Sequence, residues 1–293
     1  MTDVAGESNR TPVAGEGQAP EHHHPLADLI SEEDTLRCIR CGLCSYTCPS
    51  YRALLCESAA PRGRVALLRA VAEGKLDGSE HFAEKFYQCV LCAACSSACP
   101  GGMEVDKLLL EARRGLYEAG MAPAPVQALT ARIVAGHNIA GESNDGRLGW
   151  AENMERRPAG IDAGEAEVAY FVGCVGSLFP MSYSIPQAMV ASLEAADVSY
   201  GLLGGEEWCC GYPALIAGDV ALATELARHN VEAIRKMGAG KVVLTCPSCY
   251  HIFSHTYRAL LGEEMADIQV LHASELLAEL LEAGRLPVGP VEM

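Results

Sequence analysis

Apolar residues in the first half of the chain recur every three or four positions, with polar residues between them. This spacing places the apolar side chains on one face of an amphipathic helix. It predicts helices over residues 62–76, 104–118 and 125–136. The first half of the chain is therefore predicted to be mainly helical.

The second half alternates short apolar runs with longer amphipathic segments. The short runs are rich in valine, isoleucine and aromatic residues, as buried strands are. The predicted strands cover 168–173, 241–245 and 268–271. The predicted helices cover 185–196, 220–238, 248–261 and 273–284. Strands that alternate with helices predict an α/β layer with a small, mostly parallel sheet.

Two stretches without periodicity divide the chain. Residues 1–25 are rich in Gly, Ala, Pro and acid, which predicts a disordered acidic tail. Residues 136–167 are rich in Gly, Asn and acid, which predicts a linker. One domain is then expected over 26–135 and a second over 168–293, a division that suits a chain of 293 residues.

Charge and hydropathy narrow the function classes. The formal net charge is −16, and residues 1–34 contribute −7 of it through eight acids and one arginine. Binding to phosphate groups relies on Lys and Arg, so nucleic acid and anionic membrane surfaces are not expected partners. No apolar run reaches the roughly 20 residues of a membrane span, and no signal-peptide pattern is visible. We therefore expect a soluble, cytoplasmic protein.

The fourteen cysteines change this picture most. An even number would suit a secreted disulfide scaffold, but such scaffolds are usually shorter than about 100 residues. Here the cysteines are clustered two residues apart, which in a reducing compartment indicates bound metal. Cys56 lies outside the clusters and is interpreted as a small, buried side chain.

The pattern C-x2-C-x2-C-x3-C-P occurs twice, as "CIRCGLCSYTCP" from Cys38 and as "CVLCAACSSACP" from Cys89. Iron in a cubane cluster takes soft thiolate ligands, and in two-cluster ferredoxins the fourth cysteine of each run ligates the other cluster. Paired C-x2-C knuckles, which hold structural zinc, are a poor match. Two 4Fe–4S clusters are therefore predicted, one held by Cys38, Cys41, Cys44 and Cys99 and the other by Cys89, Cys92, Cys95 and Cys48.

These runs resemble bacterial-type ferredoxins. The residues after the first run look more specifically like the electron-transfer subunit of heterodisulfide reductases and their relatives. They are Tyr51, Arg52, Pro61, Arg62, Gly63 and Arg64. The resemblance implies a helical, ferredoxin-like domain with two clusters, which relays single electrons.

Five further cysteines fall at strand ends or helix starts of the second half. They are Cys174, Cys209, Cys210, Cys246 and Cys249. A helix N-terminus stabilises thiolate and lowers the pKa of a cysteine placed there. Five thiols exceed the four ligands of a tetrahedral zinc ion, although four of them could hold zinc and leave one spare.

The spacing C-x34-CCG-x-P…C-x2-C resembles the cysteine-rich CCG domain of the heterodisulfide reductase family, over about residues 168–284. That family includes iron–sulfur subunits of glycolate, lactate and anaerobic glycerol-3-phosphate oxidases. By this resemblance the five cysteines hold a non-cubane 4Fe–4S cluster that binds sulfur substrates, and Cys209 and Cys210 are candidate catalytic residues. Disulfide-reducing members usually carry two CCG domains, whereas this chain has one.

Other side chains near these cysteines carry weaker signals. Trp208 and Tyr212 flank the cysteine pair and either wall a cluster or simply pack. His251 and His255 follow Cys249 and could supply protons to a thiolate, although ordinary surface or core roles are more common. No dinucleotide-binding fingerprint occurs, so flavin or nicotinamide chemistry would belong to a partner.

The sequence therefore predicts an iron–sulfur oxidoreductase subunit that relays electrons between two cubanes and a CCG-domain cluster for thiol/disulfide reduction. The alternative is a pure electron-transfer subunit of a flavin dehydrogenase or quinone-linked complex, of the glycolate, lactate or glycerol-3-phosphate type. A third interpretation is a ferredoxin fused to a zinc-stapled docking domain. The expected partner is a flavin-containing or other redox subunit. A second CCG-domain subunit and a membrane-associated, quinone-reactive protein are alternative partners.

Overall fold

The computed structural model describes residues 26, 29–30, 32–286 and 289. The acidic tail predicted at 1–25 lies outside this part of the chain. All fourteen cysteines lie within it, and all are free thiols.

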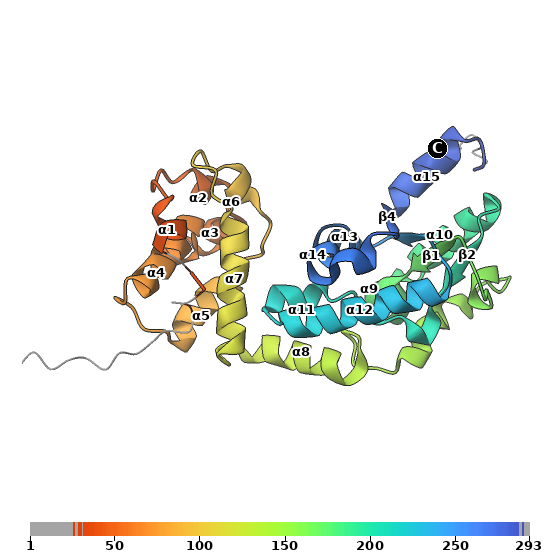
Figure 1. Cartoon of the computed structure of the whole chain (residues 1–293), viewed down its shortest axis with the longest axis horizontal. Coiled ribbons are helices and arrows are strands. Elements are labelled where there is room, and N and C mark those ends of the chain that lie inside the picture. The colour runs from red at the N-terminus through yellow and green to blue at the C-terminus, as the bar shows by residue number, and fades with distance from the viewer. Residues whose placement is uncertain (1–25, 27–28, 31, 287–288, 290–293) are drawn as a thin grey trace, which may run out of the picture.

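Short helices pack around one apolar core in the N-terminal domain (Figure 1). The helices are α1 (Glu32–Leu36), α2 (Leu43–Thr47), α3 (Pro49–Leu54), α4 (Pro61–Ala72), α5 (Glu80–Tyr87), α6 (Ala94–Ser97) and α7 (Val105–Glu118). Leu68, Phe86 and Leu109 are fully buried in this core. The helices predicted at 62–76 and 104–118 correspond to α4 and α7, and the predicted helical character of the domain is confirmed.

The C-terminal domain contains a four-stranded parallel sheet in the order β2-β1-β3-β4. The strands are β1 (Val168–Phe171), β2 (Tyr200–Leu202), β3 (Lys241–Leu244) and β4 (Gln269–His272). The predicted parallel α/β layer is confirmed. Strand β2 was not predicted, because three residues before a glycine-rich loop form too short an apolar run to indicate a strand.

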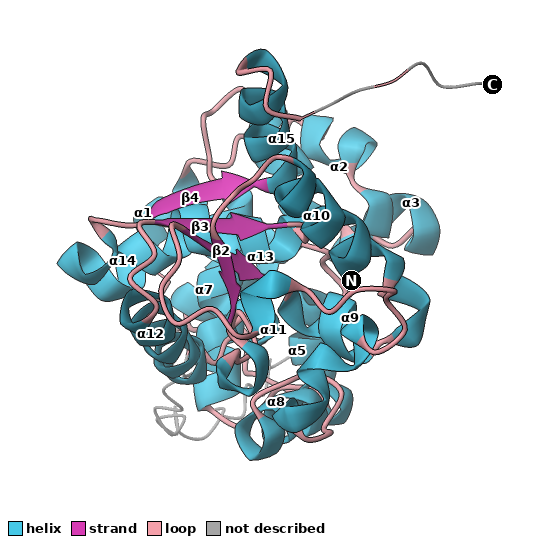
Figure 2. Cartoon of the chain, turned by 90° about the vertical axis from the view of Figure 1, so that its right-hand side faces the viewer, coloured by secondary structure: helices cyan, strands magenta, loops and turns pink. Residues whose placement is uncertain are grey.

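Helices cover both faces of this sheet (Figure 2). They are α9 (Gly173–Leu178), α10 (Ser184–Ala195), α11 (Tyr212–Ala217), α12 (Val220–Lys236), α13 (Pro247–His251), α14 (Tyr257–Leu261) and α15 (Ala273–Glu282). On one face Phe171 packs with residues of α12 and α14, and on the other Tyr170 packs with residues of α10 and α15. Alternate residues of a strand point to opposite faces, so β1 is buried on both sides.

The helix predicted over 248–261 is interrupted. A π-helical turn at Ile252–Thr256 separates α13 from α14. Such turns often occur at functional sites. This one directly follows the helix that carries Cys249.

The two domains meet along α7, α11 and the connecting helix α8 (Ala124–Gly136). The Tyr87 hydroxyl donates to the Ala217 carbonyl at 2.8 Å, and Arg113 Nη1 donates to the Ile216 carbonyl at 2.7 Å. Beyond α8, the 3-10 helix Asn144–Ala151 packs against α9 and buries Trp150 completely. The stretch without periodicity thus packs on the C-terminal domain.

Candidate metal centres

Cys38, Cys41, Cys44 and Cys99 surround a cavity of about 30 Å³ in the N-terminal domain. Its loop is bent by two residues with left-handed backbone, Arg40 at φ 58° and Gly42 at φ 85°. These bends let three cysteines that are three residues apart face one point.

Cys89, Cys92, Cys95 and Cys48 surround a second cavity of about 10 Å³. Leu91 and Ala93 occupy the loop positions equivalent to Arg40 and Gly42, and their backbone is also left-handed, at φ 51° and 57°. Each cavity therefore joins three cysteines of one run to the fourth of the other. The sequence pattern predicts this grouping, and the role of these eight thiols as cluster ligands stays a prediction.

Backbone amides near these cavities point at cysteine sulfurs. The Leu91 amide donates to Cys89 Sγ at 3.4 Å, and the Tyr51 amide donates to Cys48 Sγ at 3.4 Å. Hydrogen bonds to sulfur favour its charged form. Soft thiolates with amide donors are the environment of an iron–sulfur cluster, so both sets of residues fit that group.

The five cysteines of the C-terminal domain surround a third, larger cavity of about 160 Å³. Cys174 follows β1, Cys209 and Cys210 follow β2, and Cys246 and Cys249 follow β3. The carboxyl ends of parallel strands meet at one edge of a sheet, which explains how residues so far apart in sequence come together. Ile139, Val175, Tyr212 and Pro213 complete the largely apolar wall.

The five thiols form one continuous series of sulfur contacts. Hydrogen bonds join Cys174 to Cys209, Cys209 to Cys210, Cys210 to Cys249 and Cys249 to Cys246. The bond from Cys249 lowers the pKa of Cys246 to about 6, and bonds from Cys209 and Cys249 lower the pKa of Cys210. Hydrogen bonding to neighbouring thiols, together with burial, instead raises the pKa of Cys174 and Cys249, so protons are unevenly shared along the series.

The described residues contain no group of three His, Cys, Asp or Glu side chains arranged to hold a single metal ion. The cysteines instead stand around cavities.

A buried ion pair, which sequence reasoning missed, supports the third cavity. Arg147 Nη1 donates to Glu207 Oε1 at 2.8 Å, and Arg147 Nη2 donates to Cys174 Sγ at 3.4 Å. Glu207 also accepts the backbone amides of Val172 and Gly173, at 2.8 and 2.9 Å. Burial lowers the pKa of Arg147, but Glu207 and Cys174 outweigh that effect and raise it. Arg147 is thus a fixed cation beside the sulfur.

The two aromatic residues that flank the cysteine pair, Trp208 and Tyr212, lie in different parts of the site. Tyr212 lines the third cavity, whereas Trp208 is stacked between His137 and His229, at ring-centroid distances of 3.5 and 3.6 Å. The Cys209 amide donates to the His137 carbonyl at 2.7 Å, so this stack anchors the cysteine pair.

Three other residues lie outside the third cavity. His251 and His255 stack on each other at the surface and are not among the residues that line it. The prediction that Cys56 is buried is wrong. The Cys56 side chain is exposed, because α3 ends just before it in the exposed, left-handed Leu55, and its sulfur contacts Ser58 Oγ at 3.0 Å.

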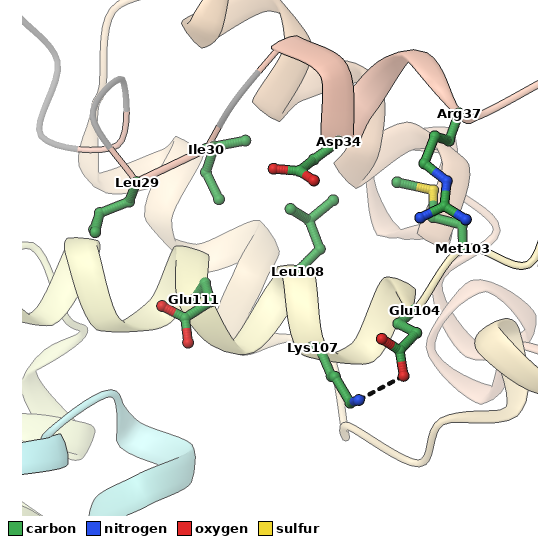
Figure 3. A pocket seen from close by; sticks show the side chains of 9 residues that line it. All are labelled: Leu29, Ile30, Asp34, Arg37, Met103, Glu104, Lys107, Leu108 and Glu111. Atoms are coloured by element: carbon green, nitrogen blue, oxygen red, sulfur yellow. Dashed lines mark ion pairs between the residues drawn. The ribbon is translucent and has the colours of Figure 1, made fainter.

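A further cavity of about 220 Å³ lies along α7 (Figure 3). Charged side chains surround it, including Asp34, Arg37 and the ion-paired Glu104 and Lys107, and no cysteine lines it. It therefore belongs to none of the three thiol sites.

Comparison with known proteins agrees with this arrangement of thiols. A model of a 4Fe–4S dicluster domain matches residues 34–103, and a model of the cysteine-rich domain CCG matches residues 168–254. The chain therefore combines a 4Fe–4S dicluster domain with a cysteine-rich CCG domain. The match to a dicluster domain implies two 4Fe–4S clusters in this part of the chain.

Curated relatives span most of the chain. One subunit of the dihydromethanophenazine:CoB–CoM heterodisulfide reductase is 30% identical in Methanosarcina barkeri and 31% in Methanosarcina mazei, over 85% of this chain. The chain spans 64% of the length of these two relatives. The glycolate oxidase iron–sulfur subunit of Escherichia coli is 26% identical over 90% of this chain and 69% of its own. No solved structure matches the chain significantly.

Proposed function

We propose that this chain is the iron–sulfur subunit of a redox complex and carries electrons between a partner subunit and its own cysteine-rich domain. We assign the two four-cysteine sets to the cubane clusters and the five-cysteine set to a non-cubane cluster. The convergence of five thiols on one cavity carries this proposal, since these thiols come from three separate strand ends. When bound, the clusters supply one-electron redox chemistry.

At the third cavity we propose that the chain reduces a disulfide. The overall change is balanced: one disulfide takes up two electrons and two protons and yields two thiols. The chain's residues would orient the substrate, with Tyr212 and Pro213 forming an apolar wall beside Cys209 and Cys210. Arg147 holds positive charge next to the thiolates throughout.

The second candidate is a pure electron-transfer subunit of a flavin dehydrogenase or quinone-linked complex. The similarity to the glycolate oxidase iron–sulfur subunit favours it. In either case we propose a flavin-containing or other redox subunit as partner. A second CCG-domain subunit or a membrane-associated, quinone-reactive protein would complete the complex. No helix in the described part of the chain has the length and apolarity to cross a membrane. The clustering of cysteines as proposed metal ligands favours a reducing, cytoplasmic location.

The test compares Cys209→Ala with Cys56→Ala in protein purified without oxygen. Cys56 is the matched control, because it is the cysteine outside all three cavities. Iron, acid-labile sulfide and zinc per chain are measured, together with electron paramagnetic resonance (EPR) spectra and thiol-linked turnover.

The wild type and Cys56→Ala should contain iron for three clusters and show an oxidised-state signal that responds to added thiol. Cys209→Ala should lose that signal and the turnover but keep both cubane signals. Unchanged turnover in Cys209→Ala would indicate that the disulfide is reduced on a partner. It would then favour the second candidate, a pure electron-transfer subunit. Iron for two clusters with one zinc ion per chain would contradict the third cluster.

A further inference from the structure

The surface over the first cubane set has a composition unlike the rest of the chain. Between Thr35 and Cys56 the sequence contains three arginines and no acid, although the whole chain has 38 acids and a net charge of −16. The arginine face is defined here as Arg37, Ile39, Arg40, Leu43 and Tyr46. These residues run from the end of α1 through the Cys41 loop into α2.

Its apolar members are among the most exposed large side chains described. Tyr46 is 85% exposed, Ile39 68% and Leu43 54%. Exposed aromatic and aliphatic side chains together with arginine are the composition of protein interfaces. Cys41 is exposed in the middle of this segment, so a protein bound here would lie directly over the first thiol set.

Neither arginine of the arginine face forms an ion pair with a described residue, although Arg37 lines a cavity together with Asp34, Glu104 and Glu111. None of the ion pairs between described residues involves Arg37 or Arg40; Arg37 donates only to the Gly102 carbonyl, at 3.4 Å. By contrast, the neighbouring Arg62 is paired with Glu57 at 2.6 Å. Two guanidinium groups without an ion pair among the described residues, next in sequence to exposed apolar side chains, favour a partner of opposite charge.

The second thiol set differs from the first in the charge of its loop and in the part of the protein that the loop contacts. Its loop from Cys89 to Pro100 carries no charged residue. Arg113 Nη2 donates to the Cys89 carbonyl while Nη1 donates to Ile216 of the cysteine-rich domain, so this loop is tied to the chain's own second domain. The two thiol sets therefore face different neighbours.

We propose that the arginine face is the docking site for an acidic protein that carries single electrons. This inference rests on the proposed electron-relay function and adds the kind of partner and its place on the chain. An anionic membrane surface would satisfy the arginines, but it would not use the exposed Cys41 at the centre of the face.

The test measures binding to two probe proteins by stopped flow and calorimetry. An acidic flavodoxin is the probe, and basic cytochrome c is the control of opposite charge. The variant Arg37→Glu/Arg40→Glu removes the positive charge. The variant Arg156→Glu/Arg258→Glu is its control, because both residues are exposed, lie far away in sequence and make the same change in net charge.

The wild type should bind flavodoxin in preference to cytochrome c, with an association rate that falls steeply with salt. Arg37→Glu/Arg40→Glu should slow association about tenfold at low salt, because charges at an interface act mainly on the association rate. Arg37→Lys/Arg40→Lys and the distant control should stay within about twofold. Tyr46→Ser should speed dissociation, whereas Met181→Ser, at a position that is 99% exposed, should not.

Three results would overturn the proposal: no binding of flavodoxin by the wild type, equal association rates for the two glutamate variants, or a preference for cytochrome c. Binding of the wild type to phosphatidylserine vesicles that is lost in Arg37→Glu/Arg40→Glu would assign the face to a membrane instead. Iron content and both cubane signals are measured in every variant. If Arg37→Glu/Arg40→Glu keeps its clusters and binds flavodoxin as the wild type does, the docking site is rejected but the electron relay is not. If the wild type itself lacks the clusters, the electron relay is rejected.

Discussion

Replacing Arg147 with methionine tests whether a fixed buried cation supports the cysteine-rich site. Arg147 and Glu207 have side chains that are 1% and 2% exposed. Methionine fills similar space but leaves the Glu207 carboxylate buried without its cation. Breaking a buried pair in this way costs about 3–5 kcal/mol of unfolding free energy. For a domain of this size, that loss lowers the unfolding temperature by about 10–20 °C.

Two further variants separate the contribution of the Arg147–Glu207 ion pair from that of the backbone hydrogen bonds to Glu207. In Glu207→Gln, one carbonyl oxygen replaces a carboxylate that accepts two backbone amides, so Val172 or Gly173 loses its acceptor. The double variant Arg147→Met/Glu207→Met removes both charges but leaves both amides without a partner. The double variant should therefore recover only part of the unfolding free energy that Arg147→Met loses. The effects of the two substitutions on that free energy should be clearly non-additive.

The assay is thermal unfolding of the anaerobic holoprotein, followed by circular dichroism, with EPR of the same samples. Arg157→Met is the control, because Arg157 pairs with Asp162 at 3.0 Å in an exposed bridge, and it should not change the midpoint measurably. In Arg147→Met the signal of the cysteine-rich domain should change while both cubane signals stay. A midpoint within about 3 °C of the wild type would refute the reasoning.

Two more predictions concern the contact between the domains. Arg113→Met should lower the reduction potential of the cubane at Cys89 in an EPR-monitored titration, because it removes a buried positive charge. Arg113→Lys should keep most of the potential, and the exposed Arg114→Met should not change it. Gly218→Ala should destabilise the protein at least twice as much as Gly238→Ala in thermal unfolding. Both glycines have positive φ, which costs about 1–2 kcal/mol for alanine, but only at Gly218 would the new Cβ lie 2.4 Å from the Arg113 carbonyl oxygen. Equal midpoints would contradict this.

The two four-cysteine sets could be predicted because most of their geometry is local. Three cysteines spaced by two residues need only the left-handed bends at Arg40 and Leu91 to face one point. The repeat then supplies the fourth thiol of each set. The parallel sheet was also predictable, since β1 and β3 contain short apolar runs and β4 contains the pair Val270 and Leu271, all between amphipathic helices.

The supporting residues could not be predicted in the same way. Arg147 meets Glu207 across 60 residues, and Arg113 meets Ile216 across 103. No local pattern links such pairs, and Arg147 lies in a stretch without periodicity. Cys56 was misjudged because the tendency of cysteine to be buried ignores where the neighbouring helix ends.

The distribution of buried charge connects these long-range contacts to the clusters. Among the described residues, the buried charged side chains are Arg64, Arg113, Arg147 and Glu207, three cations and one anion, or +2 in a chain of net charge −16. A buried cation without a counter-charge is costly. The Cys89 thiol lies near Arg113, and Arg147 Nη2 donates to the Cys174 sulfur at 3.4 Å. If these thiols ligate clusters as proposed, their negative charge offsets two of the buried cations. Loss of the clusters would leave Arg147 with Glu207 and Arg113 with backbone carbonyls, but it would remove the anionic sulfur near each. We therefore expect binding of the clusters to contribute to the free energy of folding.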